Sequence, residues 1–368
     1  MGLLYEGQTI RGTYEVERFL GEGAFAEVYR VKHRFLGRQA MKVFKTIGMT
    51  ADETETMLGE AILLSRIGHP NIVRVFDANT TDTSRGHCGF FTMEYVAGGN
   101  LEQFWQSFGS RFVPLEISVD IMRQVCRGLS VAHGEQPPII HRDIKPQNIL
   151  VGYDGSGLRV RLSDFGLAKQ VNPLTLMASA RGTRCFKAPE AFRDPQSDSC
   201  AGDVWALGSL LYLLLTDRLP YAESESLDSM NSRQFDKEVV SPSRLNIQVD
   251  PFLEGIVSKA LAMQPEGRYA NAREMLNELM KWSLRPVPPV ARPKQALGSD
   301  AAKSALGLHS PVDEKRAREM IDGAVRLARD TGMLNDAADM LEEAFNKCPD
   351  LRKEYASQLQ LWRRGVTM

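Results

Sequence analysis

The sequence predicts an α+β fold in which a short β-rich part precedes a longer, mainly helical part. Strand-forming residues fill 14–20 and 28–32, on either side of a glycine-rich turn, which is typical of a β-hairpin. Apolar residues recur at helical spacing in 57–67, and an apolar run covers 204–215. This run is shorter than the roughly 20 residues that a membrane-spanning helix needs, so we expect a buried core helix.

Length and composition indicate an ordinary globular protein. The chain has 368 residues, enough for two or three domains, of which 43% are hydrophobic and 25% charged. Its net charge is -1 and it contains no long basic run, so nothing favours nucleic acid or a membrane surface as a partner. The five cysteines are scattered and form no Cys-x-x-Cys pair, which is typical of reduced thiols.

The amino-terminal residues give no indication of membrane targeting. They lack the basic patch and apolar core of a signal peptide. Met1-Gly2 could begin a myristoylation motif, but Glu6 occupies the position that requires Ser or Thr. We therefore expect a cytoplasmic protein with no membrane partner and no nucleic-acid partner.

The most informative motif is His141-Arg142-Asp143-Ile144-Lys145-Pro146-Gln147-Asn148, with Asp164-Phe165-Gly166 beginning sixteen residues after its end. Phosphoryl transfer needs a carboxylate to orient the attacking hydroxyl, an amide and a second carboxylate to hold magnesium, and a cation beside the moving phosphate. The motif contains these four groups, as Asp143, Asn148, Asp164 and Lys145. A lone Asp-Phe-Gly would carry little weight, whereas the ordered pair of motifs is specific.

A glycine-rich segment, Gly21-Glu22-Gly23-Ala24-Phe25-Ala26-Glu27-Val28, lies at the turn of the predicted hairpin. Glycines there would let backbone amides approach the oxygens of a bound nucleotide. By itself such a segment is commonly only a turn. We expect its nucleotide-binding residues to be Gly21, Glu22, Gly23, Ala24, Phe25 and Val28.

In this order the motifs resemble those of the eukaryotic-type (Hanks-type) serine/threonine protein kinases, over roughly residues 10–284. The Asp-x-Lys-Pro-x-Asn form, with Lys145, is similar to the serine/threonine branch rather than the tyrosine branch. The resemblance implies a bilobal fold, with a small lobe of antiparallel strands and one helix beside a larger helical lobe. It also implies ATP with Mg2+, which Mn2+ could replace, in the interlobe cleft, and phosphorylation of Ser and Thr in protein substrates and in the chain itself.

The resemblance assigns a role to each motif residue. Asp143 would orient the substrate hydroxyl, and Lys145 would stabilise the transferring phosphoryl group. Asn148 and Asp164 would hold magnesium. Lys42, in Ala40-Met41-Lys42-Val43, would contact the α- and β-phosphates and pair with a glutamate on the next helix. Ala26 stands where the family has its third glycine, which would stiffen the loop.

Glu60 is the expected glutamate partner of Lys42. It lies one helical turn before Leu64 in the apolar stripe, and His69-Pro70-Asn71-Ile72-Val73 follows it at the family's spacing. Glu53 and Glu55 are alternatives. They lie nearer the start of the helix, where acids commonly complement the helix dipole.

Residues 91–100 are similar to the family's interlobe hinge. The resemblance implies that Met93 is the gatekeeper beside the adenine pocket and that the backbones of Glu94 and Val96 hydrogen-bond the base. Ala40 belongs to the same predicted ATP site. Met93 is also expected to be a core residue.

Gly182-Thr183-Arg184-Cys185-Phe186-Lys187-Ala188-Pro189-Glu190 resembles the end of an activation segment. Arg268 would then form a salt bridge with Glu190, and Asp203 would steady the catalytic-loop backbone. Thr183 would belong to the substrate platform.

The resemblance also implies a regulatory phosphate on the activation segment. In kinases with an arginine before the catalytic aspartate, such a phosphate commonly pairs with that arginine, here Arg142. Ser179 is the expected phosphorylation site, with Thr175 as the alternative.

The sequence pattern of the last part of the chain predicts a linker followed by a helical module. Prolines with small residues mark 285–311 as a linker. Three helices are expected in 312–364, from apolar stripes that include Ile321, Leu341 and Trp362. The second stripe resembles half of a tetratricopeptide repeat, so the module, 312–368, would hold one repeat at most with a further helix. It would either pack on the catalytic domain, bind a protein partner, or pair with a second copy.

Two other functions fit parts of this pattern. A pseudokinase scaffold acting through the C-terminal module is disfavoured because every metal- and phosphate-contacting residue type is present. A small-molecule kinase of the aminoglycoside type is disfavoured by the Ala188-Pro189-Glu190 segment with Thr183, which forms the peptide platform in protein kinases.

Overall fold

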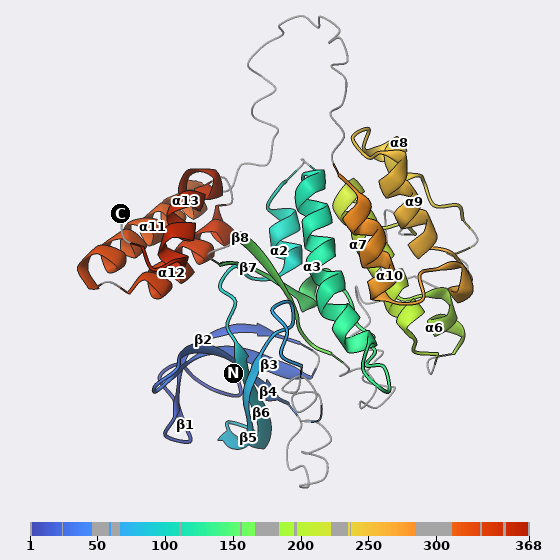
Figure 1. Ribbon diagram of the computed structural model, residues 1–368. Coiled ribbons are helices and arrows are strands. Elements are labelled where there is room, and N and C mark those ends of the chain that lie inside the picture. Colours follow the sequence, from blue (N-terminus) through green and yellow to red (C-terminus); the bar gives the residue numbers. More distant parts are fainter. Residues whose placement is uncertain are drawn as a thin grey trace, which may run out of the picture.

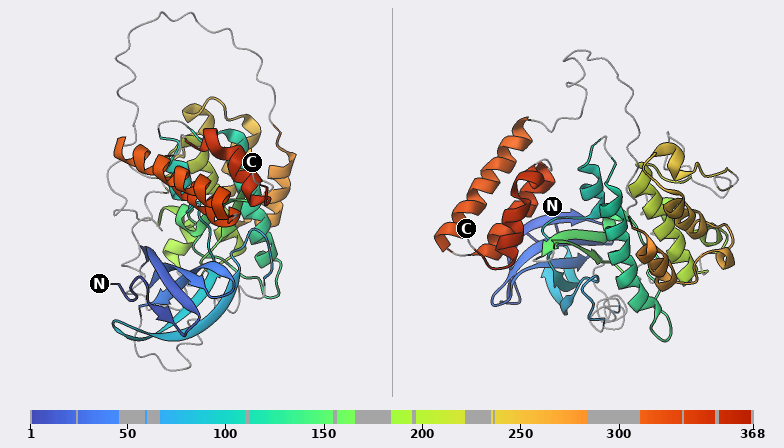
Figure 2. Two further views of the ribbon diagram at one scale, coloured as in Figure 1. Left: turned by 90° about the vertical axis from the view of Figure 1, so that its left-hand side faces the viewer. Right: turned by 45° about the horizontal axis from the view of Figure 1, so that its top comes forward.

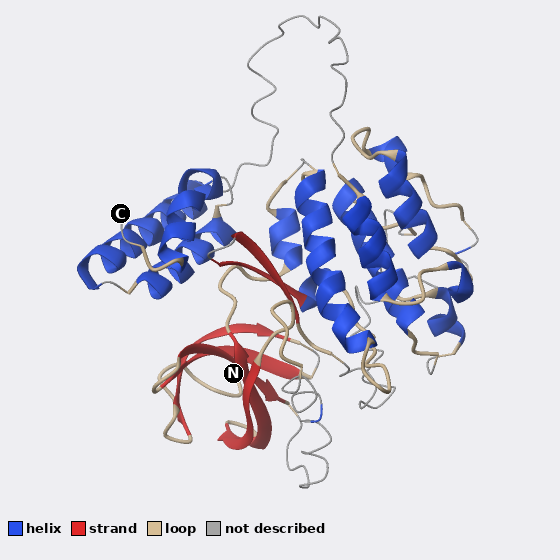
Figure 3. Cartoon of the chain, in the orientation of Figure 1, coloured by secondary structure: helices blue, strands red, loops and turns tan. Residues whose placement is uncertain are grey.

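The α+β class and the division into two lobes are confirmed by the structure, a computed structural model (Figures 1 and 3). The residues that it describes are 2–23, 25–45, 59, 67–109, 112–154, 157–165, 184–194, 197–221, 235, 237–283, 311–331, 333–348 and 351–366. Strands dominate the first lobe, helices the second, and three further helices pack beside both lobes (Figure 2).

The small lobe is built on one antiparallel sheet in the order β1-β2-β3-β4-β6-β5. Its strands are β1 (Thr9–Ile10), β2 (Tyr14–Glu22), β3 (Ala26–His33), β4 (Gly37–Phe44), β5 (Val75–Thr83) and β6 (Gly86–Glu94). The predicted hairpin is present as β2 and β3, which pair from Tyr14 opposite His33 to Glu22 opposite Glu27. The helix predicted at 57–67 lies outside the described residues, except for Gly59 and Ile67.

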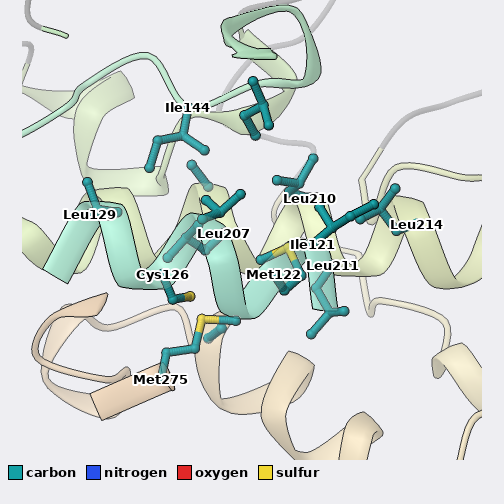
Figure 4. Packing of buried hydrophobic residues seen from close by; sticks show 14 of the residues in the cluster. Ile121, Met122, Cys126, Leu129, Ile144, Leu207, Leu210, Leu211, Leu214 and Met275 are labelled. Carbon is teal, nitrogen blue, oxygen red and sulfur yellow. The ribbon is translucent and has the colours of Figure 1, made fainter. Parts of the chain in front are cut away.

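The large lobe is a set of helices around one hydrophobic core. Its elements are α2 (Leu101–Gln106), α3 (Leu115–His133), η1 (Pro146–Asn148), β7 (Ile149–Asp154), β8 (Gly157–Leu162), η3 (Arg184–Phe186), α6 (Pro189–Arg193), α7 (Cys200–Thr216), α8 (Pro242–Leu245), α9 (Pro251–Ala260), η6 (Pro265–Gly267) and α10 (Ala272–Lys281). The apolar run at 204–215 forms most of α7 and is fully buried, as predicted. Figure 4 shows its leucines packed against Ile121, Met122 and Cys126 of α3 and against Met275 of α10. No helix among the described residues is both long and apolar enough to cross a bilayer.

The three predicted C-terminal helices are α11 (Pro311–Thr331), α12 (Leu334–Lys347) and α13 (Arg352–Arg363). We call residues 311–366 the C-terminal module. Its apolar stripes form a core of their own, in which Ile321, Leu341, Phe345, Leu359 and Trp362 are buried. Most of the predicted linker, from 285 to 310, lies outside the described residues.

The module packs on the catalytic lobes, which is the first of the three arrangements left open by the sequence. Tyr153 of β7 lies against the module's core, and α13 runs along β7. Glu342 of α12 accepts hydrogen bonds from the Tyr153 N–H (3.3 Å) and from Arg363 Nη2 (2.7 Å). The contact therefore brings a buried carboxylate of the module against the large lobe.

Burial changes the titration of Glu342. Desolvation raises the pKa of this carboxyl from 4.5 to about 7, although the charge and hydrogen bonds of Arg363 act in the opposite direction. The nearby Asp339 carboxylate of α12 also raises this pKa. Between about pH 4.5 and 7 the folded protein therefore holds a proton that the unfolded chain has lost.

This proton linkage predicts that the contribution of Glu342 to stability falls as pH rises through that window and levels off above it. We expect the wild type to lose stability relative to Glu342→Gln by on the order of 3 kcal/mol between about pH 4.5 and 7.5. Denaturant unfolding of both proteins across this range measures the difference. Stability curves that stay parallel at all pH values would contradict the raised pKa.

Candidate active site

A buried carboxylate on α7 holds the catalytic loop, residues 141–148, in place. Asp203 accepts hydrogen bonds from the backbone N–H groups of His141 (2.7 Å) and Arg142 (2.9 Å). It also lies 3.0 Å from His133 Nε2. Burial alone would lower the pKa of His133, but the hydrogen bonds and charges of Asp203 and Cys200 raise it to about 9. His133 thus pairs with Asp203, and Asp203 in turn holds the backbone of the loop.

The loop brings the predicted catalytic residues within hydrogen-bonding distance of one another. Asn148 Nδ2 donates to Asp143 Oδ2 (2.9 Å) and to the Asp143 carbonyl (2.8 Å). Lys145 Nζ lies 2.8 Å from the same Oδ2. The other oxygen, Oδ1, is buried and has no hydrogen-bond partner among the described residues. One oxygen of Asp143 is therefore held in place, and the other has an unused acceptor position.

The second carboxylate of the site is on the segment after β8. Asp164 forms an ion pair with Lys42 of β4, which is almost fully buried. Burial alone would raise the pKa of Asp164, but the charge and hydrogen bond of Lys42 outweigh it and hold the pKa below its usual value. Asp164 is thus ionised at neutral pH. Its φ of 61° is in the left-handed region, a conformation that is often found at functional sites.

His141 helps to hold the segment that carries Asp164. Its Nε2 is 3.1 Å from the Ser163 carbonyl, and its ring lies 4.4 Å from that of Phe165. Burial lowers the pKa of His141, so the ring is neutral at physiological pH. A neutral ring can donate its single N–H to the carbonyl without adding a charge to the site.

The predicted hinge joins the two lobes beside an apolar cluster. Met93, near the end of β6, is buried and pairs across the sheet with Ala40 of β4. Val28 packs against the same cluster from β3 and Leu150 from β7, so both lobes contribute to it. The Val96 N–H makes no hydrogen bond to the other described residues. An apolar slot with a free backbone donor suits a flat heteroaromatic ring such as adenine.

Sequence reasoning did not include Leu150 among the site residues. Its signal was its position two residues after Asn148, on the strand that leads away from the catalytic loop.

The glycine-rich turn is held by Lys45. This side chain pairs with Glu22 and donates to the Gly23 carbonyl (2.8 Å). Gly21 has open space where a Cβ would lie, and Phe25 and Val28 follow in the described part of the turn. Several predicted residues lie outside the described residues, namely Ala24, Glu60, Thr175, Ser179 and Thr183.

A buried ion pair supports the segment after the catalytic loop. Arg268 donates to both carboxylate oxygens of Glu190, at 2.6 and 2.8 Å, from a fully buried side chain. Arg142 Nε donates to Asp198 (2.7 Å), and Lys187 Nζ donates to the Arg142 carbonyl (2.6 Å). These contacts border a hollow between the catalytic loop, α6 and α7 whose lining includes Asp143.

The family model of the protein kinase domain matches residues 14–282. The chain belongs to the protein kinase family. Serine/threonine-protein kinase PrkC of Bacillus subtilis is 33% identical over 273 residues, which cover 73% of this chain and 40% of PrkC. PknB of Mycolicibacterium smegmatis is 30% identical over 317 residues, covering 84% of this chain and 48% of PknB.

Solved structures show the same fold. The PknI kinase domain of Mycobacterium tuberculosis superposes with a TM-score of 0.56 at 26% identity, covering 76% of this chain and 99% of PknI's domain. The kinase spans only 39%, 56% and 48% of the lengths of three curated relatives that it matches. The C-terminal module lies beyond the segment that the family model matches.

The side chains of the site fit a divalent cation carried with phosphate. Asp164 is an ionised oxygen donor, and Asn148 uses its amide nitrogen toward Asp143, which leaves its amide oxygen for another contact. Mg2+ prefers such oxygen donors. The described residues include no cluster of three or more His, Cys, Asp or Glu side chains that could hold a metal ion. An ion here would therefore complete its shell with phosphate oxygens and water.

Proposed function

We propose that this chain is a serine/threonine protein kinase that transfers the γ-phosphate of ATP to Ser and Thr hydroxyls of protein substrates, and to its own. The observation that carries the proposal is the cluster in which Lys145 and Asn148 both lie within 3 Å of the Asp143 carboxylate. Beside it, the Lys42–Asp164 ion pair joins the two lobes. Family membership supports the same activity.

Each residue of this cluster has a definite part in the proposed reaction. Asp143 accepts the hydroxyl proton on its unpaired Oδ1 and aligns the nucleophile. Lys145, beside it, stabilises negative charge on the transferring group. Lys42, paired in the family manner with Glu60, positions the nucleotide phosphates. Asn148 and Asp164 hold Mg2+, which Mn2+ could replace and which neutralises charge on the phosphates.

The nucleotide would occupy the slot between the hinge and the glycine-rich turn. Met93 limits the depth of that slot, while the backbones of Glu94 and Val96 bind the base. Ala40, Val28 and the turn residues Gly21 to Phe25 enclose the sugar and phosphates. Burial of Met93 and Ala40 supports this placement.

The proposed domains are the catalytic domain at 10–284, the linker at 285–311 and the helical module at 312–368. The module would hold a single tetratricopeptide-like repeat and a further helix, and 312–364 could also contact a protein partner or a second copy. We propose a cytoplasmic location, with no nucleic-acid or membrane partner. A pseudokinase scaffold is disfavoured because Lys42, Asp143 and Asp164 are all retained.

A phosphorylation assay tests the proposed function directly. Purified protein with radiolabelled ATP, Mg2+ and a generic basic protein should incorporate label into itself and into that protein, on Ser and Thr only. Phosphoamino-acid analysis measures this specificity. Addition of EDTA is the control, since chelation should stop incorporation. Absence of label in the presence of both Mg2+ and Mn2+ would refute the proposal.

Autophosphorylation is expected on the activation segment. In the guanidinium of Arg142 only Nε donates a hydrogen bond to another described residue, Asp198, so its two Nη groups could pair with a phosphate. Mass spectrometry of the autophosphorylated protein should find Ser179 or Thr175 occupied, and the double alanine variant should lose activity. Full activity of that variant would show that Asp198 is a sufficient counter-ion for Arg142.

A further inference from the structure

Helix α12 lies beside the hinge, and its side chains contact both lobes. Figure 1 shows where this helix lies in the molecule. Two consecutive glutamates make these contacts, and each is directed to a different lobe. Both side chains are nearly inaccessible, with exposed fractions of 1% for Glu342 and 10% for Glu343.

Glu343 binds the small lobe and the hinge. Its Oε1 lies 2.6 Å from Arg30 of β3 and 2.9 Å from Arg18 of β2. The same oxygen accepts a hydrogen bond from the hydroxyl of Tyr95 (2.8 Å). Tyr95 stands between Glu94 and Val96, the two hinge residues proposed to bind the base. One carboxylate thus joins the hinge to two strands that cover the nucleotide site.

A third ion pair extends the contact along the small lobe. Arg38 of β4 lies 3.1 Å from Asp336, six residues or about one and two-thirds helical turns before Glu342 on α12. Three adjacent strands therefore each supply one arginine to this helix.

Glu342 and its neighbours bind the large lobe. Glu342 accepts from the Tyr153 N–H, and a Cβ built on Gly98 or Gly152 would come within 3.1 or 3.3 Å of its Oε2. Asn346 Nδ2 donates to the Ala97 carbonyl (3.3 Å). These contacts use Ala97 and Gly98 in the hinge and the end of β7.

The guanidinium of Arg352, on α13, adds a contact deeper in the large lobe, 4.8 Å from the ring of Phe104. The module therefore holds the small lobe by ion pairs, and the large lobe by the hydrogen bond of Glu342 and the ring contact of Arg352. Rotation of one lobe away from the other would separate either Glu343 from its arginines or Glu342 from β7. The first would leave a buried carboxylate without its arginines and the second would leave the Tyr153 N–H without its acceptor, and both are unfavourable, so such rotation is opposed.

We propose that Glu343, together with Glu342, is a positioning residue for nucleotide binding: it fixes Tyr95 and the two lobes at the spacing that ATP requires. This inference rests on the proposed kinase function. Docking of the module and binding of ATP then favour each other, because both stabilise the same arrangement of the two lobes. Glu343 touches neither substrate nor reacting atoms and acts through the hinge.

The test compares Glu343→Gln, which removes the charge at constant shape, with Glu319→Gln, a matched change at an exposed residue of α11. Equilibrium binding of a fluorescent ATP analogue with Mg2+ and steady-state kinetics are measured on the full chain. Glu343→Gln should raise both the nucleotide Kd and KM for ATP by about tenfold. The KM for peptide and kcat at saturating ATP should stay within about twofold of wild type, as should all values for Glu319→Gln.

Tyr95→Phe provides a second, milder variant that removes only the hydroxyl bound by Glu343. It should weaken ATP binding in the same direction by a smaller factor, which keeps the test decisive if Glu343→Gln folds poorly. Nucleotide Kd values equal to those of Glu319→Gln in both variants would overturn the inference while leaving the kinase activity intact. Wild-type protein that neither binds ATP nor phosphorylates would overturn the proposed function and the inference together.

Discussion

Asp143→Asn is expected to lower kcat for peptide phosphorylation by about 10² to 10⁴-fold, the usual contribution of a positioned acid or base. The amide keeps the shape of the side chain and a contact with Asn148, but it can no longer accept the substrate's proton or attract Lys145. Initial rates at saturating ATP measure the effect. Nucleotide binding should be retained, because Lys42 and Asp164 are unchanged.

Asp82→Asn is the matched control for this substitution. Asp82 lies on β5, and its side chain is 94% exposed, so the same chemical change there should leave kcat unaltered. Equal activity of Asp143→Asn and wild type would remove the catalytic assignment, because no other described carboxylate is held in this way by Asn148 and Lys145.

Arg268→Met should give the largest loss of stability. The fully buried guanidinium donates to Glu190 and to the backbone carbonyls of Ala201, Ala262 and Met263. Methionine fills similar volume but leaves the carboxylate of Glu190 and these carbonyls without their donor. Breaking one side of a buried pair costs about 3 to 5 kcal/mol, which corresponds to a fall in Tm of about 10 °C for a domain of this size.

Thermal unfolding followed by circular dichroism measures this loss. Arg273→Met is the control, because Arg273 is exposed on α10 and its replacement should change stability by less than about 0.5 kcal/mol. A Tm for Arg268→Met within about 2 °C of wild type would show that the ion pair is not a principal support of the large lobe.

The catalytic residues could be predicted because their chemistry is confined to short segments. Asp143, Lys145 and Asn148 lie on one loop, so their spacing in the sequence nearly determines their spacing in the fold. Glu190 and Arg268 are 78 residues apart, and only the order of the family's motifs indicated their pairing. The structure brings them together. Leu150 was not predicted because a leucine in a strand has no reactive or charged group that would mark it as a site residue.

The docking of the C-terminal module could not be predicted in the same way. Its apolar stripes were expected to need an outside surface to cover, but Leu341 and Phe345 are largely used inside the module's own core. Contact with the lobes is made instead by charged residues, and Arg30 and Glu343 are separated by 313 positions. In the sequence, arginines spaced along exposed strands resemble ordinary solvent-exposed charges. No neighbouring residue indicates a partner far along the chain.

The arginine contacts of α12 bear on how the catalytic domain behaves in isolation. A fragment ending near Trp282 would leave Arg18, Arg30 and Arg38 without the carboxylates of Glu343 and Asp336. Arg30 and Arg38 would still share Glu17, so three arginines on neighbouring strands would face one carboxylate. Such an excess of positive charge attracts polyanions without specificity. Nucleic acid or heparin retained by that fragment during purification would therefore report the missing helix rather than a natural ligand.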